Sequence, residues 1–216
     1  MNEARQQRIP PHLAPQKGEI RLFKNNILER LSRISPKTEL AVYLPMIVFA
    51  TWQSFMVGVG TATFAVLFFS GIIFWTVFEY LLHRFVFHFF PEGEFQERIQ
   101  FLFHGVHHQY PNDKDRLVMP VTLSLLIAVL LFLIFKAIFG EMVWGFFAGF
   151  ALGYLAYDMM HYSIHHVRTP RSMYLKKLWK HHMDHHFRDT RKGFGVSSAM
   201  WDHVFATMQE HKNGRK

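Results

Sequence analysis

Four long apolar stretches dominate the pattern of hydrophobic and polar positions along this chain. They cover about 40–57, 61–82, 118–139 and 142–160, and each is almost free of charged residues. A run of roughly 20 apolar residues is the length of helix that crosses a bilayer. The pattern therefore predicts an all-α integral membrane protein with four transmembrane helices. The first stretch begins only after a polar, basic segment, so no cleaved signal peptide is expected.

The short connections between these stretches predict two helical hairpins. Residues 58–60 (GVG) join the first pair, and Gly140 and Glu141 join the second. Both turns should then lie on the same side of the membrane. Lys and Arg are found elsewhere, with 8 in 1–39, 4 in 84–116 and 11 in 168–216, whereas Lys136 is the one basic residue near a turn. Because positive charge favours the cytoplasmic side, both termini and the middle loop are expected there.

The polar parts of the chain are expected to form a cytoplasmic helical lobe. Residues 1–19 are interpreted as a flexible arm and 209–216 as a polar tail, which leaves 20–208 as a single membrane domain. Helices are predicted at 94–108 and 171–189, followed by a closing segment at 193–208. Between Ile20 and Ile34, apolar residues recur at helical spacing opposite Arg and Lys, which is typical of a helix on a membrane surface. Packing on the lobe would give the same pattern.

Charge and cysteine content narrow the class of protein further. The net charge is +8, but the basic residues flank the apolar stretches and form no aromatic-interleaved patch. Contact with anionic membrane lipids explains them better than binding of nucleic acid, which is not expected as a partner. The chain has no Cys, which excludes disulfides and thiolate metal sites.

Ten of the 15 histidines fall into four clusters on the predicted cytoplasmic side. The spacings are H-x4-H, H-x2-H-H, H-x3-H and H-x2-H-H, formed in order by His83, His88; His104, His107, His108; His161, His165; and His182, His185, His186. Steps of three or four residues return to one face of a helix, so each such cluster should point in one direction. The step of five from His83 to His88 predicts an unwound turn. Ten imidazoles are too many for one ion, so we expect two metal ions.

The clustering itself favours metal binding, because converging imidazoles without a metal would repel one another when protonated and would cost desolvation when neutral. The remaining histidines and the nearby acids are expected to have other roles. His166 and His181 fall outside the patterns and are expected either to support the ligands or to lie at the surface. For His12, His203 and His211 an ordinary interfacial or hydrogen-bonded role is expected. Acidic side chains near the clusters should accept the second N–H of ligating imidazoles, with a salt bridge to a neighbouring arginine as the alternative. These acids are Glu79, Asp158, Asp184 and Asp202.

Five stretches of the chain resemble a known family. They are RLFKNNILERLSRISP (21–36), FEYLLHRFVFH (78–88), FHGVHHQYPNDKDRLVMP (103–120), YLAYDMMHYSIHH (154–166) and HHMDHHFRDTRKGFGVSSAMWDHVF (181–205). Together they resemble the fatty acid 2-hydroxylases of the fatty acid hydroxylase and sterol desaturase superfamily, which are membrane di-metal oxygenases. The resemblance covers nearly everything after residue 20. It implies that the same ten histidines bind the metals and that Tyr154, Tyr157 and Asp158 are catalytic residues near the substrate. Packing in an interfacial aromatic belt is the alternative for both tyrosines.

The resemblance also implies an activity. A di-iron centre would use O2 and two electrons to hydroxylate C2 of a fatty acyl chain, which is free, thioester-linked or part of a ceramide-type lipid. Zinc can fill such a site in purified protein but has no redox chemistry. The sequence contains no H-P-G-G haem motif, so the expected electron donor is a separate protein of the cytochrome b5 or ferredoxin type. On the same ground, a bacterial inner membrane is favoured over the endoplasmic reticulum.

Two other classes of protein remain open at this point. A sterol desaturase or carotenoid hydroxylase would keep the histidine pattern, although DKDRLVMP and GFGVSSAMWD favour the 2-hydroxylases. A metal transporter or a bis-histidine haem protein, neither of them an enzyme, would need ligands at membrane depth or in facing pairs across the spans. The clusters here lie at one interface.

Overall fold

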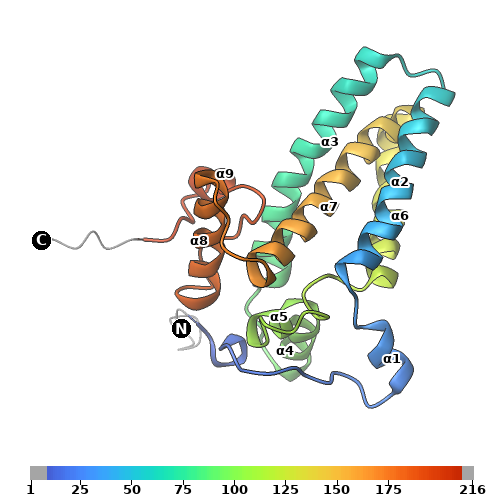
Figure 1. The fold of residues 1–216 in the computed structure, drawn as a ribbon. Coiled ribbons are helices and arrows are strands. Elements are labelled where there is room, and N and C mark those ends of the chain that lie inside the picture. Colours follow the sequence, from blue (N-terminus) through green and yellow to red (C-terminus); the bar gives the residue numbers. More distant parts are fainter. Residues whose placement is uncertain (1–8, 211–216) are drawn as a thin grey trace, which may run out of the picture.

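The computed structural model describes residues 9–210, and this part of the chain is helical with no strands (Figure 1). Four long helices form a bundle: α2 (Pro36–Met56), α3 (Thr61–Leu81), α6 (Val121–Phe139) and α7 (Val143–His166). Shorter helices gather at one end of this bundle, and we call that part the end region. They are α1 (Asn26–Leu31), α4 (Glu94–Gln100), α5 (Val106–Gln109), α8 (Met173–Phe187) and α9 (Met200–Val204).

Two tight turns arrange the long helices as hairpins, as predicted. The α2–α3 turn contains Gly58 at φ +84°, and the α6–α7 turn is a 3-10 helix, Gly140–Met142, with Gly140 at φ +57°. Glycine suits such positive φ values because it has no Cβ. Both turns lie at the end of the bundle away from the end region (Figure 1).

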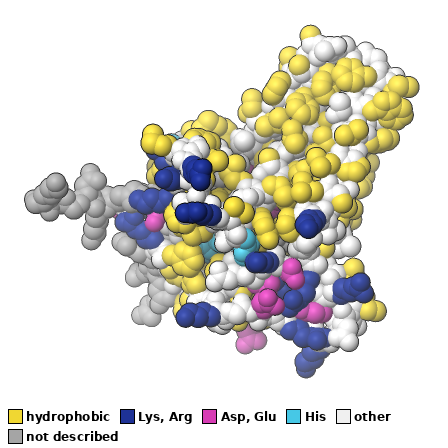
Figure 2. All heavy atoms as spheres, viewed as in Figure 1, with side chains coloured by type: hydrophobic (Ala, Val, Ile, Leu, Met, Phe, Trp, Pro, Cys, Tyr) yellow, Lys and Arg dark blue, Asp and Glu magenta, His cyan; other side chains and the backbone are white. Residues whose placement is uncertain are grey.

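Two continuous helical stretches are long and apolar enough to cross a membrane. They are Thr61–Phe87 and Val121–His166, and the second contains both α6 and α7. Only 11% and 22% of their most apolar windows are buried, and side chains such as Val66, Phe69 and Ile138 are exposed. A soluble protein would bury such helices, whereas a bilayer solvates them. Figure 2 shows the contrast between the hydrophobic bundle and the charged end region, which suggests a membrane protein.

Helices α3 and α7 pack at very short range because glycines line their contact. A Cβ added to Gly71 would lie 2.1 Å from the carbonyl oxygen of Phe146, and one added to Gly149 would lie 1.8 Å from that of Phe68. Small residues allow helix backbones to approach in this way. The two helices run in the same direction, so their carboxyl ends meet at the end region.

The first histidine pair lies on a π-helix. Helix α3 continues into a π-helical segment, Leu82–Phe87, in which the N–H of His88 donates to the carbonyl of His83 at 3.1 Å. A π turn bonds residues five apart and therefore places them on one face. The helix is widened here, and the expectation of an unwound turn is wrong. A second π segment, Phe101–Gly105, links α4 to α5 and carries His104.

The segment 20–34 is helical only over Asn26–Leu31. The side chain of Asn25 caps this helix by accepting the N–H groups of Ile27 and Leu28 at 2.8 and 3.2 Å. The Glu29 carboxylate accepts the N–H groups of Leu22 and Phe23 at 3.0 and 3.1 Å. These contacts hold the preceding residues outside the helix, so the expected longer surface helix is wrong.

The described parts of both terminal segments are packed against the end region. Leu13 is buried, and the Gln109 amide donates to the carbonyl of His12 at 2.7 Å. The Gln209 amide donates to the carbonyls of Asp189 and Lys192 at 2.8 and 2.9 Å. Residues 1–8 and 211–216, which belong to the predicted arm and tail, lie outside the described part.

Candidate metal centre

The ten patterned histidines lie together in two groups of five. In each group the five candidate ligand atoms lie within 4.8 Å of one another. The rings of His108 and His186, one from each group, stack with their centroids 4.0 Å apart, so the groups adjoin. We call the groups site A, which is His83, His88, His104, His108 and His185, and site B, which is His107, His161, His165, His182 and His186.

The helical step decides which site a histidine joins. Pairs four residues apart stay together, as His104 and His108 do in site A, and the π-helical pair His83 and His88 does the same. A residue next to such a pair is turned by about 100° on an α-helix. His107 and His185 therefore join the opposite site from their cluster neighbours. The expectation that each H-x2-H-H cluster points in one direction is wrong.

The spacing of the ring nitrogens fits a metal ion. The Nε2 atoms of His83 and His104 are 3.0 Å apart, and those of His88 and His185 are also 3.0 Å apart. In site B, the His107–His186 and His165–His182 pairs have the same separation, 3.0 Å. Ligands at right angles around an ion with metal–nitrogen distances of about 2.1 Å are about 3.0 Å apart.

Burial keeps these imidazoles in the form that binds metal. Eight of the ten are buried, and His88 and His165 are partly exposed. Burial, and then the neighbouring imidazoles, lower the pKa of His104, His107 and His182 well below its usual range. A neutral imidazole has a free lone pair to donate to a metal. The buried Nε2 of His161 has no hydrogen-bond partner, as expected of an atom that binds a metal. With two groups of five such nitrogens, the donors fit two ions.

Backbone carbonyls orient two of the candidate ligands. The Nδ1 of His83 lies 2.5 Å from the carbonyl oxygen of Phe194, and that of His185 lies 2.8 Å from the carbonyl oxygen of Lys192. A proton on Nδ1 satisfies both bonds and leaves the Nε2 lone pair facing the centre of site A.

The acids were predicted for this orienting role, and for two of them that prediction is wrong. Glu79 accepts backbone N–H groups from Val196 and Ser197 at 2.6 and 2.9 Å. Asp202 lies 3.0 Å from the Nε2 of His181, so its partner is neither a ligating imidazole nor an arginine. His166 and His181 belong to neither site.

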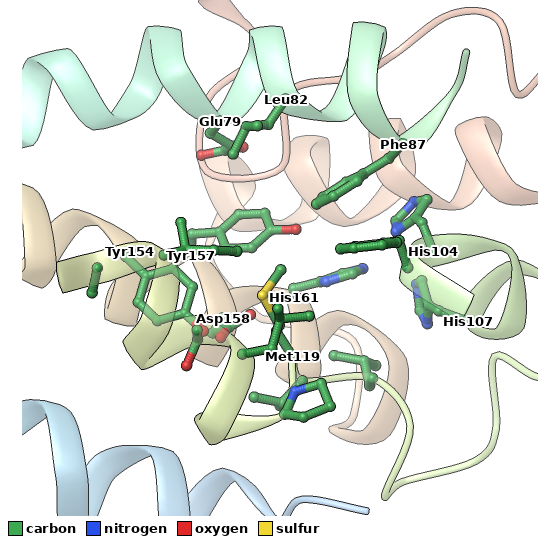
Figure 3. Close-up of a pocket in the computed structure, with 18 of the residues that line it drawn as sticks. Glu79, Leu82, Phe87, His104, His107, Met119, Tyr154, Tyr157, Asp158 and His161 are labelled. Atoms are coloured by element: carbon green, nitrogen blue, oxygen red, sulfur yellow. The ribbon is translucent and has the colours of Figure 1, made fainter. Parts of the chain in front are cut away.

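An apolar cavity of about 340 Å³ ends at the histidines (Figure 3). His104, His107 and His161 line one end of it, and the other end extends between α6 and α7 as far as Leu131 and Phe147. The three residues predicted as catalytic, Tyr154, Tyr157 and Asp158, also line this cavity, and all three are buried.

Some residues in the cavity lining or next to it escaped the sequence analysis. Glu39 accepts a hydrogen bond from the Tyr154 hydroxyl at 2.6 Å beside the cavity. Leu22, Phe23 and Arg116 line the cavity near α1. In the sequence, Arg116 is marked only by its charge within DKDRLVMP. A buried arginine needs a partner of opposite charge. Its partner is Glu29, which lies far away in the sequence.

The fold and the site define a class of membrane protein with two adjoining histidine groups that could hold metal ions at the end of an apolar cavity. Residues 68–207 match the family model described as fatty acid hydroxylase. The chain belongs to the fatty acid hydroxylase family. Its relatives indicate an enzyme, a hydroxylating monooxygenase.

Curated relatives match most of the chain. The dihydroceramide fatty acyl 2-hydroxylase FAH1 of Arabidopsis thaliana is 36% identical over 197 residues, which is 91% of this chain and 83% of FAH1. The fatty acid 2-hydroxylase of Macaca fascicularis is 34% identical over 214 residues, covering 89% of this chain and 58% of the relative. The ceramide very long chain fatty acid hydroxylase SCS7 of Saccharomyces cerevisiae is 37% identical over 196 residues, and the chain spans 50% of it.

A solved structure has the same fold. It is described as full-length scs7p with only the hydroxylase domain visible. It superposes on this chain with a TM-score of 0.86 at 34% sequence identity. The match covers 94% of this chain and 78% of the scs7p chain.

Proposed function

We propose that this chain hydroxylates C2 of a fatty acyl chain at a di-iron centre formed by the ten histidines of sites A and B. The acyl chain is a free fatty acid, a thioester or the amide-linked chain of a ceramide-type lipid. Two electrons come from a separate donor of the cytochrome b5 or ferredoxin type. The observation that carries the proposal is the apolar cavity that ends at the histidines. Names of relatives that act on fatty acyl chains support the substrate class.

The bound iron would supply the redox chemistry that activates O2 for insertion into an unactivated C–H bond, which zinc cannot do. Its holders would be His83, His88, His104, His108 and His185 in site A, and His107, His161, His165, His182 and His186 in site B. The chain's own task is to bind the acyl chain, exclude water and hold C2 beside the histidines.

The shape of the cavity favours C2 over a position in mid-chain. On α7 the lining runs from His161 to Phe147, which is roughly 21 Å at about 1.5 Å per residue. An acyl tail in this apolar part leaves its carbonyl end at the histidines, where Asp158 and Tyr157 add polar groups (Figure 3). C2 is the carbon next to that carbonyl. We assign Asp158, Tyr154 and Tyr157 to holding this polar end.

The membrane arrangement belongs to the same proposal. All four long helices cross the bilayer, and the end region is a cytoplasmic lobe that carries the active site. The two hairpins support this topology because their turns lie at one end of the bundle, away from most Lys and Arg. The histidines then lie at the cytoplasmic interface, where a soluble electron donor can approach.

Expression in a host that lacks 2-hydroxylated lipids tests the proposed activity. We expect 2-hydroxy fatty acids or 2-hydroxy ceramides to appear in the lipid extract, as measured by mass spectrometry. The matched control is the His107→Ala, His185→Ala double variant, which should give none. An unsaturated product would support a desaturase instead, and the absence of any new lipid would contradict the proposal.

A further inference from the structure

We infer that Asp202 and Glu79 are positioning residues for site A, and that they act through the loop formed by residues 192–197. This loop is part of the stretch KGFGVSSAMWD, which spacing arguments leave without a role. The inference rests on the proposed binding of metal, and it does not depend on which lipid is the substrate.

The loop contacts two candidate ligands of the same site. The carbonyl oxygen of Phe194 lies 2.5 Å from the Nδ1 of His83, and the carbonyl oxygen of Lys192 lies 2.8 Å from the Nδ1 of His185. Each carbonyl can accept a hydrogen bond from a protonated Nδ1. His83 lies at the end of α3 and His185 lies on α8, so one loop sets the ring orientation of ligands from two separate helices. Both histidines belong to site A.

Two buried carboxylates hold the loop from behind. The N–H groups of Phe194 and Gly195 donate to Asp202 at 2.9 and 2.8 Å. The N–H groups of Val196 and Ser197 donate to Glu79 at 2.6 and 2.9 Å, and the Ser197 hydroxyl donates to the same carboxylate. Four successive backbone donors thus end on two side chains that are 0% and 3% exposed.

The surroundings of Asp202 fix its orientation. The Thr207 hydroxyl donates to Oδ1 at 2.7 Å, and the Nε2 of His181 lies 3.0 Å from Oδ2. His181, the one histidine of HHMDHH that belongs to neither site, therefore holds the Asp202 carboxylate in place, and Asp202 in turn holds the loop. A Cβ on Gly195 would lie 2.0 Å from the carbonyl oxygen of Ser198, so the close turn requires glycine there.

Loss of either carboxylate should therefore weaken site A selectively. Buried N–H groups without an acceptor are costly, so the loop would shift and its two carbonyls would move away from the imidazoles. Changes to groups that orient metal ligands typically cost about 10- to 100-fold in metal affinity. Site B receives no such bond from this loop in the part of the chain that the structure describes, and it should keep its ion.

The test is a titration of metal-stripped, detergent-purified protein with Zn²⁺ or Co²⁺. Two tight ions per chain are expected for the unchanged protein. Asp202→Asn should retain one tight ion, with the other weakened by about 10- to 100-fold. Ser197→Ala is a milder variant that removes a single hydroxyl, and it should show a smaller loss at one site. The visible absorption of bound Co²⁺ should lose one component in Asp202→Asn.

Glu29→Gln is the matched control. Glu29 is also a buried carboxylate that accepts two successive backbone N–H groups, those of Leu22 and Phe23. Its ion pairs are with Arg33 and Arg116, and none of these partners belongs to site A or site B. This variant should retain two tight ions. Equal weakening of both ions in Ser197→Ala and Asp202→Asn, or no weakening in either, would overturn the inference. Two tight ions with no hydroxylated lipid would refute the proposed function alone.

Discussion

At the scale of single residues, the position of each histidine around its helix determines which of the two sites it joins. The ten candidate ligands could be found from the sequence because their spacings repeat. Their division between two sites could not, because it depends on where each helix points. His107 and His108 are neighbours in sequence, yet they serve different sites. The orienting carbonyls of Lys192 and Phe194 were also beyond prediction, since a backbone group leaves no signature in the sequence.

Single-histidine variants should separate the two sites. His185→Ala removes a proposed ligand of site A, and His107→Ala removes a proposed ligand of site B. Each should bind about one ion tightly and lose hydroxylation, because the reaction needs both. Metal analysis and product formation are the measurements, and His203→Ala, on an exposed residue, is the control. Full activity in either variant would remove that residue from the ligand set.

Asp158 provides a test of substrate positioning. The variant Asp158→Asn should keep both ions, because Asp158 lies in the cavity and outside both histidine groups. Its kcat/KM should fall by about tenfold or more, since small errors in placing a reacting carbon are costly. Asp115→Asn, at a half-exposed carboxylate outside the cavity, should behave as the unchanged protein. Unchanged kcat/KM in Asp158→Asn would refute the assigned role.

At the scale of elements, the long apolar helices were predictable and the local departures from them were not. The predicted stretch 61–82 corresponds to α3, Thr61–Leu81. The π-helical extension carrying His83 and His88 escaped prediction because apolar periodicity does not distinguish a step of four from one of five. The shortening of α1 depends on contacts of Asn25 and Glu29, which a helical pattern does not show.

The α3–α7 contact should be sensitive to a single methyl group. Gly149→Ala places a Cβ against the backbone of Phe68 and forces the helices apart. We expect a loss of about 1 to 3 kcal/mol in stability, together with weaker metal binding, because the contact aligns the helix ends of both sites. Thermal unfolding in detergent and metal content measure these effects.

Gly60→Ala is the matched control for this prediction. A Cβ at Gly60 would meet nothing within 4 Å, and its φ of −69° suits alanine. Stability should therefore stay close to that of the unchanged protein. Equal behaviour of the two variants would contradict the close packing of α3 against α7.

At the scale of the whole molecule, the sequence predicted a hairpin bundle with histidines at one end, and the arrangement of the elements agrees (Figure 1). The cavity was not predictable in shape, because its lining comes from helices of both hairpins and from the segment before α1. The cavity reaches histidines of both groups, so a molecule bound between the long helices would lie next to the proposed metal sites.

The proposed topology can be mapped because the chain has no Cys. A single cysteine introduced as Glu141→Cys should lie on the side opposite the end region, and one introduced as Lys176→Cys on the cytoplasmic side. In intact cells, a thiol reagent that cannot cross membranes should label the first variant and spare the second. Labelling of both, or of the second alone, would contradict the four-span arrangement.

Hydroxylation at C2 is tested most directly with purified, iron-loaded protein, an electron donor, an acyl lipid and isotopically labelled dioxygen. Mass spectrometry of the product measures where the label is found. We expect one labelled oxygen atom at C2 of the acyl chain and none in the His185→Ala variant. Label at another carbon, or a product whose new oxygen comes from water, would contradict it.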